Sequence, residues 1–475
     1  MKKKLICILI VISMFSGILS ACGSGKKVEP VKGENLAVNA SYTHNDKTST
    51  SFSLKSRGRS EVKIKFPSAI TFNTIVLNEK TTCVDAFEFW IEKDGKLEII
   101  YKQDEIGGTR YCYLDEITTD NLILRAYAID GEFNINSFEV YNTKRPQKDF
   151  RTTTYLPVDQ FLRDYAENPQ YSDGLNHVTD IILFGCAKYD EKGELNVNEE
   201  ALDKTLKIIS EIRKDNKNPL NIYCDFVLKS EIKNDKNLPS QEFFASLQKI
   251  ALQENKAKLI DNLVVFANEK QLSGISFDYE YPYSHDDYNV FSNFLVEMKK
   301  SAPKTKIAIA VAPWGLLYTQ EAKDAVDVFE VMAYDLMDKK GNHSGWQNCC
   351  VDAINYMAGK GIDLKKVDLG IPFYSRPTDY GNKWDSWRGD VSKISRFGNF
   401  TSFEGISYED DAGTKPFWTK GKWYNGENLV MDKTAYCYDV GVGGIMVFQY
   451  NCDVEYSNER SLMANLNSVF DDTSK

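Results

Sequence analysis

Two carboxylates stand close together in residues 272–282, whose sequence is LSGISFDYEYP. Successive side chains of a β-strand point to opposite faces, so Ser276, Asp278 and Glu280 share one face. Carboxylates that are brought together away from water have pKa values driven apart, so one can hold a proton while the other is ionised. The pattern therefore indicates general acid–base chemistry. The alternative is an acidic strand end without a function.

The region around this stretch, residues 150–475, alternates apolar strand-like runs with helical stripes such as the one from Leu202 to Ile212. The strand-like runs are 178–185, 220–228, 274–280, 306–313, 328–335, 367–374 and 443–450. This alternation predicts the α/β class and a (β/α)8 TIM barrel, whose active sites lie at the C-terminal ends of the strands. A doubly wound sheet is the alternative, but no glycine-rich phosphate loop supports it.

The preceding region, residues 34–142, lacks helical periodicity and contains short alternating runs that are separated by turn signals such as Asp94-Gly95 and Gly107-Gly108. This pattern predicts an N-terminal antiparallel β-sandwich of the jelly-roll kind. Residues 143–149, of sequence TKRPQKD, are predicted to be the linker to the barrel domain at 150–475.

The first 21 residues predict a signal peptide, because Lys2 to Lys4 precede an apolar run that is too short to cross a bilayer comfortably. Leu19-Ser20-Ala21-Cys22 resembles a bacterial lipobox, so Cys22 is the expected lipidation site and residues 22–33 are a flexible spacer. The protein is therefore expected to be exported and held by a lipid anchor on the outer face of a bacterial cell membrane. A coincidental cysteine after an ordinary signal peptide is the alternative.

Charge and cysteine usage exclude several classes of partner. The chain has 58 Lys and Arg against 68 Asp and Glu, a net charge of −10, so no nucleic-acid partner is expected. It has no CxxC motif, and its four histidines stand singly at positions 44, 177, 285 and 343. No metal or other cofactor is therefore expected. The oligomeric state and the pairing of the cysteines stay open.

Residues 150–470 resemble glycoside hydrolase family 18. Residues 272–282 resemble its signature, in which acidic residues alternate with hydrophobic ones before an aromatic residue and a final Glu. Counterparts in the same order are VMAYD, LGIPFYSR and GKWYNGENLVMDKTAYCYDVGVGGIMVF. The N-terminal phrases FNTIVLNE, FEFWIEKDGKLEIIYK, LILRAY and INSFEVYN resemble the discoidin-like (coagulation-factor type C) family, although the usual Trp of that family is absent from the N-terminal part.

The resemblance implies a retaining, substrate-assisted glycosidase of the chitinase or endo-β-N-acetylglucosaminidase type. By position, Glu280 matches the general acid/base, and Asp278 matches the carboxylate that shares its proton and orients the 2-acetamido group of the substrate. Tyr334 matches the tyrosine that binds the acetamido carbonyl, whose oxygen is the nucleophile. The implied partner is a glycan that contains N-acetylglucosamine, with a β-1,4 bond in chitin-like oligomers or in N-glycan chitobiose cores, and peptidoglycan as a third candidate.

Asp335, Tyr374 and Arg376 are implied to line the cleft, and Trp314 and Trp346 are candidate stacking platforms for sugars. Regular alternation would point only one of the adjacent Tyr334 and Asp335 inward, so the use of both predicts that the strand ends there. Three positions depart from the family pattern. Ser273 and Ser276 stand where the signature has Asp, and Ser276 is expected to hydrogen-bond Asp278 without adding charge. Phe448 replaces the Trp that usually forms the floor of the central subsite, so it keeps a stacking face and loses an N–H donor. The alternative function is a catalytically degenerate, glycan-binding surface lipoprotein.

Overall fold

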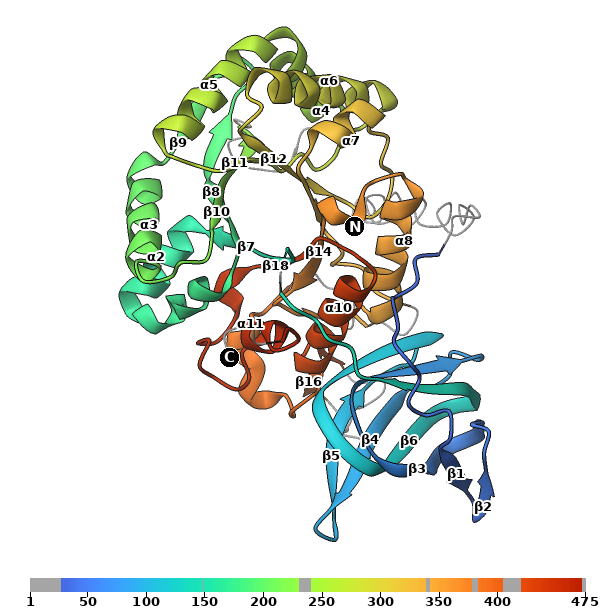
Figure 1. Cartoon of the computed structure of the whole chain (residues 1–475). Helices are drawn as coiled ribbons and strands as arrows, with labels where there is room; N and C mark the ends of the chain where they lie inside the picture. Colours follow the sequence, from blue (N-terminus) through green and yellow to red (C-terminus); the bar gives the residue numbers. More distant parts are fainter. Residues whose placement is uncertain are drawn as a thin grey trace.

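A computed structural model describes residues 27–147, 149–229, 241–338, 342–377, 383–404 and 420–471. It contains a barrel and an N-terminal sandwich that lie against each other (Figure 1). Within these ranges no helix is both long and apolar enough to span a membrane. The leader and Cys22 lie outside the described residues.

The barrel consists of eight parallel strands in a closed ring. They are β7 (Arg151–Pro157), β8 (Asp180–Tyr189), β10 (Asn221–Leu228), β11 (Gly274–Phe277), β12 (Lys306–Val311), β13 (Val328–Val331), β14 (Val367–Pro372) and β18 (Gly444–Phe448). Each strand pairs with the next in this order, including β8 with β10. The last strand, β18, pairs with the first, β7, and this pairing closes the ring. The predicted fold class is therefore confirmed. The sequence RTTTYLP of β7 gives little apolar signal, and this strand was missing from the prediction.

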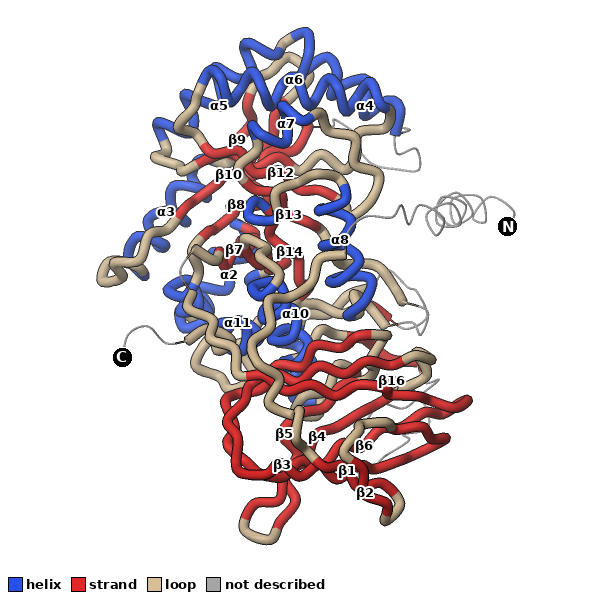
Figure 2. The backbone as a smooth tube through the Cα atoms, turned by 45° about the vertical axis from the view of Figure 1, so that its right-hand side comes forward, coloured by secondary structure: helices blue, strands red, loops and turns tan. Residues whose placement is uncertain are grey.

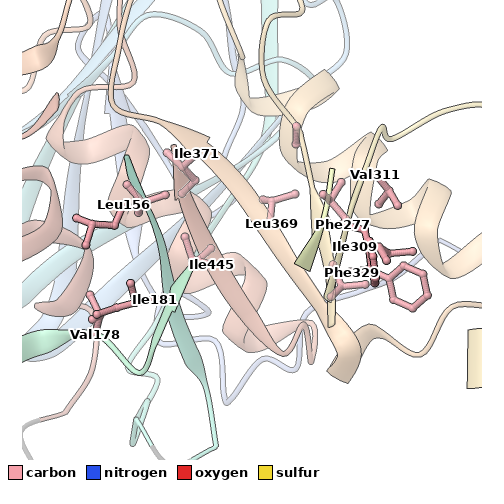
Figure 3. Close-up of a cluster of buried hydrophobic side chains, with 14 of the residues drawn as sticks. Leu156, Val178, Ile181, Phe277, Ile309, Val311, Phe329, Leu369, Ile371 and Ile445 are labelled. Carbon is pink, nitrogen blue, oxygen red and sulfur yellow. The ribbon is translucent and has the colours of Figure 1, made fainter. Parts of the chain in front are cut away.

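Helices form the outer ring of the barrel (Figure 1). The main ones are α2 (Val158–Glu167), α3 (Glu199–Ile212), α4 (Gln241–Lys249), α5 (Lys256–Glu269), α6 (His285–Ser301), α7 (Gln320–Ala325), α8 (Asp352–Gly359), α10 (Glu427–Asp439) and α11 (Leu462–Asn467). Buried side chains such as Ile309, Phe329 and Leu369 come from neighbouring strands and fill the core (Figure 3). The first residue of β11, Gly274, has no room for a side chain. A Cβ atom at this position would lie only 2.3 Å from the Lys306 carbonyl oxygen.

The sandwich contains β1 (Ser41–His44), β2 (Lys47–Ser49), β3 (Leu54–Glu79), β4 (Ala86–Lys93), β5 (Lys96–Gln103) and β6 (Thr109–Tyr141). The strands are ordered β2-β1-β3-β6-β4-β5, and alternate residues of β3 such as Val62, Ile64 and Phe66 are buried. These side chains join the separate core of the sandwich, which confirms that the alternating runs form an antiparallel sheet domain.

The sandwich packs against α10 of the barrel domain (Figures 1 and 2). Asp432 of α10 accepts hydrogen bonds from the Arg110 guanidinium at 2.5 Å and from the Tyr101 hydroxyl at 2.7 Å. Arg145, which falls in the predicted linker, is fully buried and makes two hydrogen bonds to Asp439, at 3.0 and 2.7 Å. The two domains therefore share a polar interface that excludes water.

The described part of the predicted flexible spacer, residues 27–33, is also attached to the barrel. The Val28 N–H donates to the Asn355 side chain at 2.8 Å, and the Val31 N–H donates to the Asp439 carbonyl oxygen at 2.9 Å. Both hydrogen bonds reach the barrel domain. The flexible spacer at residues 22–33 stays a prediction.

Candidate active site

A cavity of about 380 Å³ opens at the C-terminal ends of the barrel strands. Its walls are aromatic, and four charged side chains line it. The lining residues are Tyr155, Phe184, Asp278, Glu280, Tyr281, Ala310, Trp314, Met332, Tyr334, Asp335, Tyr374, Arg376, Trp384, Phe448 and Gln449. A concave aromatic site with a few charged groups is suited to binding a sugar ring.

The alternation predicted for residues 276–280 is present. Phe277 and Tyr279 point outward, where their rings lie 6.1 and 5.5 Å from that of Phe291 on α6. Ser276 lies inside the barrel and is fully buried, and Asp278 and Glu280 line the cavity. Strand β11 ends at Phe277, so both carboxylates stand on the loop that follows it.

A capping box ends this loop. The Ser284 hydroxyl accepts from the Asp287 N–H at 3.3 Å, and the Asp287 carboxylate accepts from the Ser284 N–H at 2.8 Å. These reciprocal bonds satisfy free N–H groups where α6 begins. They fix the C-terminal end of the loop that runs from the end of β11 to the start of α6 and carries Glu280.

Asp278 is poorly solvated and faces other acids. Burial, the charges of Asp225 and Glu280, and a hydrogen bond with Glu280 raise the pKa of Asp278 well above its ordinary value. Its Oδ1 atom is buried without a hydrogen-bond partner. Glu280 is exposed to the cavity, so the two neighbouring carboxyl groups have different surroundings. This is the arrangement that a shared proton requires.

Ser276 does not make the expected hydrogen bond to Asp278. Its hydroxyl donates instead to Asp225 Oδ1 on the neighbouring strand β10, at 2.9 Å. The strand register places Asp225 directly opposite Ser276. Sequence reasoning missed Asp225, and its only signal was a lone acidic residue within the apolar run of residues 220–228.

The second wall carries Tyr334 and Asp335, both of which line the cavity. Strict alternation would place only one of two adjacent residues inside a barrel. Strand β13 ends at Val331, and Asp335 has a φ of +59°, so the chain has left the strand before it reaches them. The prediction that the strand must end near this point is confirmed.

Asp335 binds the polar groups of this wall. Its Oδ1 accepts from the Tyr374 hydroxyl at 2.7 Å and from Arg376 Nε at 2.7 Å, and it lies 3.1 Å from Nε2 of the buried His343. Burial opposes ionisation, but these hydrogen bonds from His343, Arg376 and Tyr374 keep the pKa of Asp335 below its ordinary value. Asp335 is therefore an ionised anchor for Tyr374 and Arg376. His343 was absent from the predicted site.

Aromatic rings form the floor of the cavity. The ring of Phe448 stacks on that of Tyr334 with a centroid distance of 5.6 Å and an interplanar angle of 28°, and lies 5.7 Å from that of Tyr155. Burial raises the pKa of Tyr334 well above its ordinary value, so its hydroxyl keeps its proton and can donate a hydrogen bond.

The two tryptophan candidates have different positions. Trp314 lines the cavity, with its ring 6.3 Å from that of Tyr281. Trp346 is wrong as a cleft residue, because it is 1% exposed and its N–H donates to the Thr109 carbonyl oxygen at the sandwich interface, at 2.8 Å. Trp384 lines the cavity and is 48% exposed, although it was not among the predicted site residues. Tyr281 was also missed.

Within the described ranges, no three His, Cys, Asp or Glu side chains are grouped as a set of metal ligands.

Comparison with known proteins places this geometry in context. The family model described as "Glycosyl hydrolases family 18" matches residues 161–453. A killer toxin protein (subunits alpha/beta) of Kluyveromyces lactis is 28% identical over 146 residues, which cover 26% of this chain and 13% of the length of that relative.

Solved structures share the barrel fold. The chitinase ChiB from the chitin utilization locus of Flavobacterium johnsoniae is 19% identical, with a TM-score of 0.51, over 69% of this chain and 94% of that chain. The spore cortex-lytic enzyme SleL of Bacillus cereus is 17% identical, with a TM-score of 0.51, over 73% and 79%. The chitinase-like agglutinin of Robinia pseudoacacia is 15% identical, with a TM-score of 0.51, over 67% and 99%. At these identities the likeness shows the fold alone.

Proposed function

The chain belongs to glycosyl hydrolase family 18, and on this premise we propose that it is a retaining glycosidase that cleaves β-1,4 bonds next to N-acetylglucosamine. The observation that carries the proposal is the meeting of Glu280, Asp278 and Tyr334 in one aromatic cavity at the mouth of the barrel. In this proposal, chitin-like oligomers and the chitobiose core of N-glycans are the two main substrate classes, and peptidoglycan is the third.

Glu280 is the proposed general acid. It is the carboxyl group exposed to the cavity, so it can reach the glycosidic oxygen of a bound chain and donate its proton to the leaving group. After the leaving group departs, the same carboxylate accepts a proton from the attacking water, which restores the acid.

The nucleophile in this mechanism is the oxygen of the 2-acetamido group of the substrate. Asp278, beside Glu280, accepts the acetamido N–H and stabilises the positive charge of the cyclic oxazolinium intermediate. Tyr334, from the opposite wall, donates a hydrogen bond that holds the acetamido group near the anomeric carbon. A tethered nucleophile gains effective molarity over an external one. Asp335 keeps Arg376 and Tyr374 in place as groups that line the cleft.

The substrate requirement tests this mechanism. A fluorogenic β-glycoside of N,N′-diacetylchitobiose should be cleaved with retention of anomeric configuration, and its glucose analogue with the same leaving group should be inert. A thiazoline mimic of the oxazolinium ion should inhibit competitively. Efficient cleavage of the glucose analogue, or trapping of a covalent bond to Asp278 by a fluorosugar, would overturn the substrate-assisted mechanism.

The substrate class needs a separate experiment. Mass spectrometry of products from chitooligosaccharides and from a high-mannose glycoprotein would distinguish the two main classes. Binding without hydrolysis of either substrate would favour the alternative, a glycan-binding protein, for which the departures Ser276 and Phe448 are the sequence argument.

Attachment to a bacterial membrane through Cys22 is a further part of the proposal, because a diacylated cysteine gives stable anchoring. The wild-type protein should partition into the detergent phase, and Cys22→Ser should abolish that partition. Retention of both forms in membranes would exclude this anchor. The discoidin-like identity of the sandwich stays a prediction from the sequence.

A further inference from the structure

We propose that Asp225 is a positioning residue of the reaction, a buried carboxylic acid that holds a proton beneath Asp278 and sets the ionisation of the Asp278–Glu280 pair. The proposal rests on the proposed function and deepens it. It assigns to strand β10 a carboxyl group that the sequence pattern would place at position 276 of β11.

The pairing of β10 with β11 places Asp225 near the catalytic loop. Asp225 is opposite Ser276, and Phe226 is opposite Phe277. The Asp278 N–H donates to the Phe226 carbonyl oxygen at 3.3 Å, so the β10–β11 contact continues to the catalytic loop. Asp225 therefore lies on the strand next to that of Ser276. It is deeper in the barrel than Asp278, which follows Ser276 by two residues. The resemblance to the family signature predicts a carboxylate at position 276, and in this chain the neighbouring strand carries one directly opposite, at position 225.

Asp225 is buried among other titratable side chains. It is 1% exposed, and the hydroxyl of Ser276 donates to its Oδ1. The titratable groups that interact with it are acids, phenols and thiols from neighbouring elements. They are Tyr155 on β7, Cys186 and Tyr189 on β8, Cys224 on β10, Asp278 and Glu280 after β11, and Glu330 on β13.

No cation appears among these groups of the described chain, so none of them would compensate a negative charge on Asp225. Burial raises the pKa of Asp225 to about 8, although the Ser276 hydrogen bond acts in the opposite direction. A carboxylate without a cation in the interior is costly, and protonation removes that cost. At neutral pH Asp225 is therefore a neutral acid.

The link between Asp225 and the catalytic pair is electrostatic. Asp225, Asp278 and Glu280 form a series from the interior to the cavity, and Asp225 and Glu280 both act on Asp278. Three carboxyl groups in one site titrate as a unit. While Asp225 keeps its proton, Asp278 and Glu280 can share a single proton. Glu280 gives that proton to the glycosidic oxygen, which leaves both carboxylates of the pair ionised above a neutral Asp225. Once Asp225 ionises, its charge keeps the remaining protons on the pair. No proton leaves Asp225 during turnover.

The test uses charge variants on the two paired strands. Activity of the full chain toward the chitobiose glycoside is measured from pH 4 to pH 9. Asp225→Asn cannot take on the negative charge that Asp225 acquires at high pH, so the basic limb of kcat/KM should move to lower pH by about half a unit or more, with a corresponding loss of activity on that side of the profile. Ser276→Asp adds a charge, so its basic limb should move to higher pH. The double variant Asp225→Ser/Ser276→Asp should return both the profile and the rate to within about threefold of wild type.

Asp432→Asn provides the matched control. Asp432 is a fully buried carboxyl group at the sandwich interface, where its partners are Arg110, Tyr101 and the Tyr113 N–H, so its replacement should leave the basic limb in place. Limbs that do not move in the single variants, or a double variant no better than the singles, would overturn the proposal. Opposite shifts followed by mutual rescue are not expected from a merely structural role.

A second measurement separates this proposal from the proposed function. If the wild type cleaves no N-acetylglucosamine glycoside, the proposed function fails and the catalytic role of Asp225 fails with it. The proton itself is detected without substrate, by carbon-13 NMR of the Asp225 carboxyl group, which Asp225→Asn identifies. A carboxyl signal that titrates near its ordinary value would overturn the proposal even if the enzyme were active.

Discussion

The mouth of the barrel and the sandwich–barrel interface both bury carboxyl groups, but they treat them differently. At the interface, Asp432 accepts hydrogen bonds from the Arg110 guanidinium, the Tyr101 hydroxyl and the Tyr113 N–H. At the mouth, Asp278 Oδ1 has no hydrogen-bond partner, and the hydroxyl of Ser276 is the hydrogen-bond donor to Asp225.

This difference indicates what each region does. An aspartate that is surrounded by an arginine, a phenol and a backbone N–H holds two domains in a fixed orientation, since its removal would leave a buried charge alone. An aspartate that faces other acids holds a proton that small changes can move, which is useful for chemistry and unfavourable for stability. Changes at the mouth should therefore affect turnover, and changes at the interface should affect folding.

Glu280→Gln gives the largest expected effect on turnover. Glutamine preserves the shape of the side chain and removes the proton donor, so kcat/KM should fall by about 10²–10⁴-fold while the melting temperature and oligosaccharide binding stay close to wild type. Steady-state kinetics and calorimetric titration measure both. Glu297→Gln on the exposed face of α6 is the control and should have full activity. Unchanged hydrolysis in Glu280→Gln would assign the acid to another residue.

Asp432→Ala should have the opposite profile. Removing one partner of a buried ion pair leaves Arg110 uncompensated, which costs about 3–5 kcal/mol of unfolding free energy. Chemical denaturation measures this loss, and protein that stays folded should turn over substrate at the wild-type rate. Asp120→Ala removes a surface ion pair with Lys65 that solvent screens, so the variant should stay close to wild type in stability. Equal losses in the two variants would contradict the comparison.

The pH dependence of stability separates the two regions next. Burial raises the pKa of Asp432 to about 6 and that of Asp225 to about 8, against about 4 for an unfolded aspartate. Between the unfolded and folded pKa values the native state holds the extra proton, so each group lowers stability as pH rises, by about 1.4 kcal/mol per pH unit. The loss of unfolding free energy that Asp432 causes therefore ends near pH 6, whereas the loss that Asp225 causes continues to pH 8.

Asp225→Asn cannot titrate, so between pH 6 and pH 8 its unfolding free energy should gain about 2 kcal/mol relative to wild type. Asp432→Asn should show no comparable gain in this window. Urea denaturation at pH 5, 6, 7 and 8 provides the measurement. Parallel wild-type and Asp225→Asn curves would show that Asp225 is already ionised at pH 6.

The sequence predicts those parts of the molecule that depend on local patterns. The alternation in residues 276–280 was sufficient to place Asp278 and Glu280 at the mouth, and adjacent Tyr334 and Asp335 were sufficient to predict the end of a strand. Asp225 could not be found in this way, because its importance comes from a register with Ser276, 51 residues later, that no local pattern specifies.

The interface was hidden for the same reason. Arg110 and Asp432 are 322 residues apart, and a buried arginine in a sandwich strand resembles any exposed one in sequence. Trp346 was therefore assigned to the cleft on residue type alone, although its position beside Arg110 makes it part of the domain contact. Residue type predicts what a side chain can do, and the tertiary fold determines where it does so.

Two tryptophans give the comparison its smallest and most selective test. Trp384 is half-exposed and lies edge-on to Tyr374 at 5.6 Å, so it can stack on a sugar with little loss of packing when it is removed. Trp384→Ala should raise KM by about fivefold, equivalent to about 1 kcal/mol of aromatic contact, with an unchanged melting temperature. Trp346→Phe, which loses the hydrogen bond to the Thr109 carbonyl oxygen, should cost about 1 kcal/mol of stability and leave KM unchanged. Thermal unfolding and initial-rate kinetics on both variants distinguish a loss of substrate binding from a loss of stability.

A higher KM in Trp346→Phe would mean that a change in packing at the interface alters the cleft. The functional division between the two regions would then be wrong.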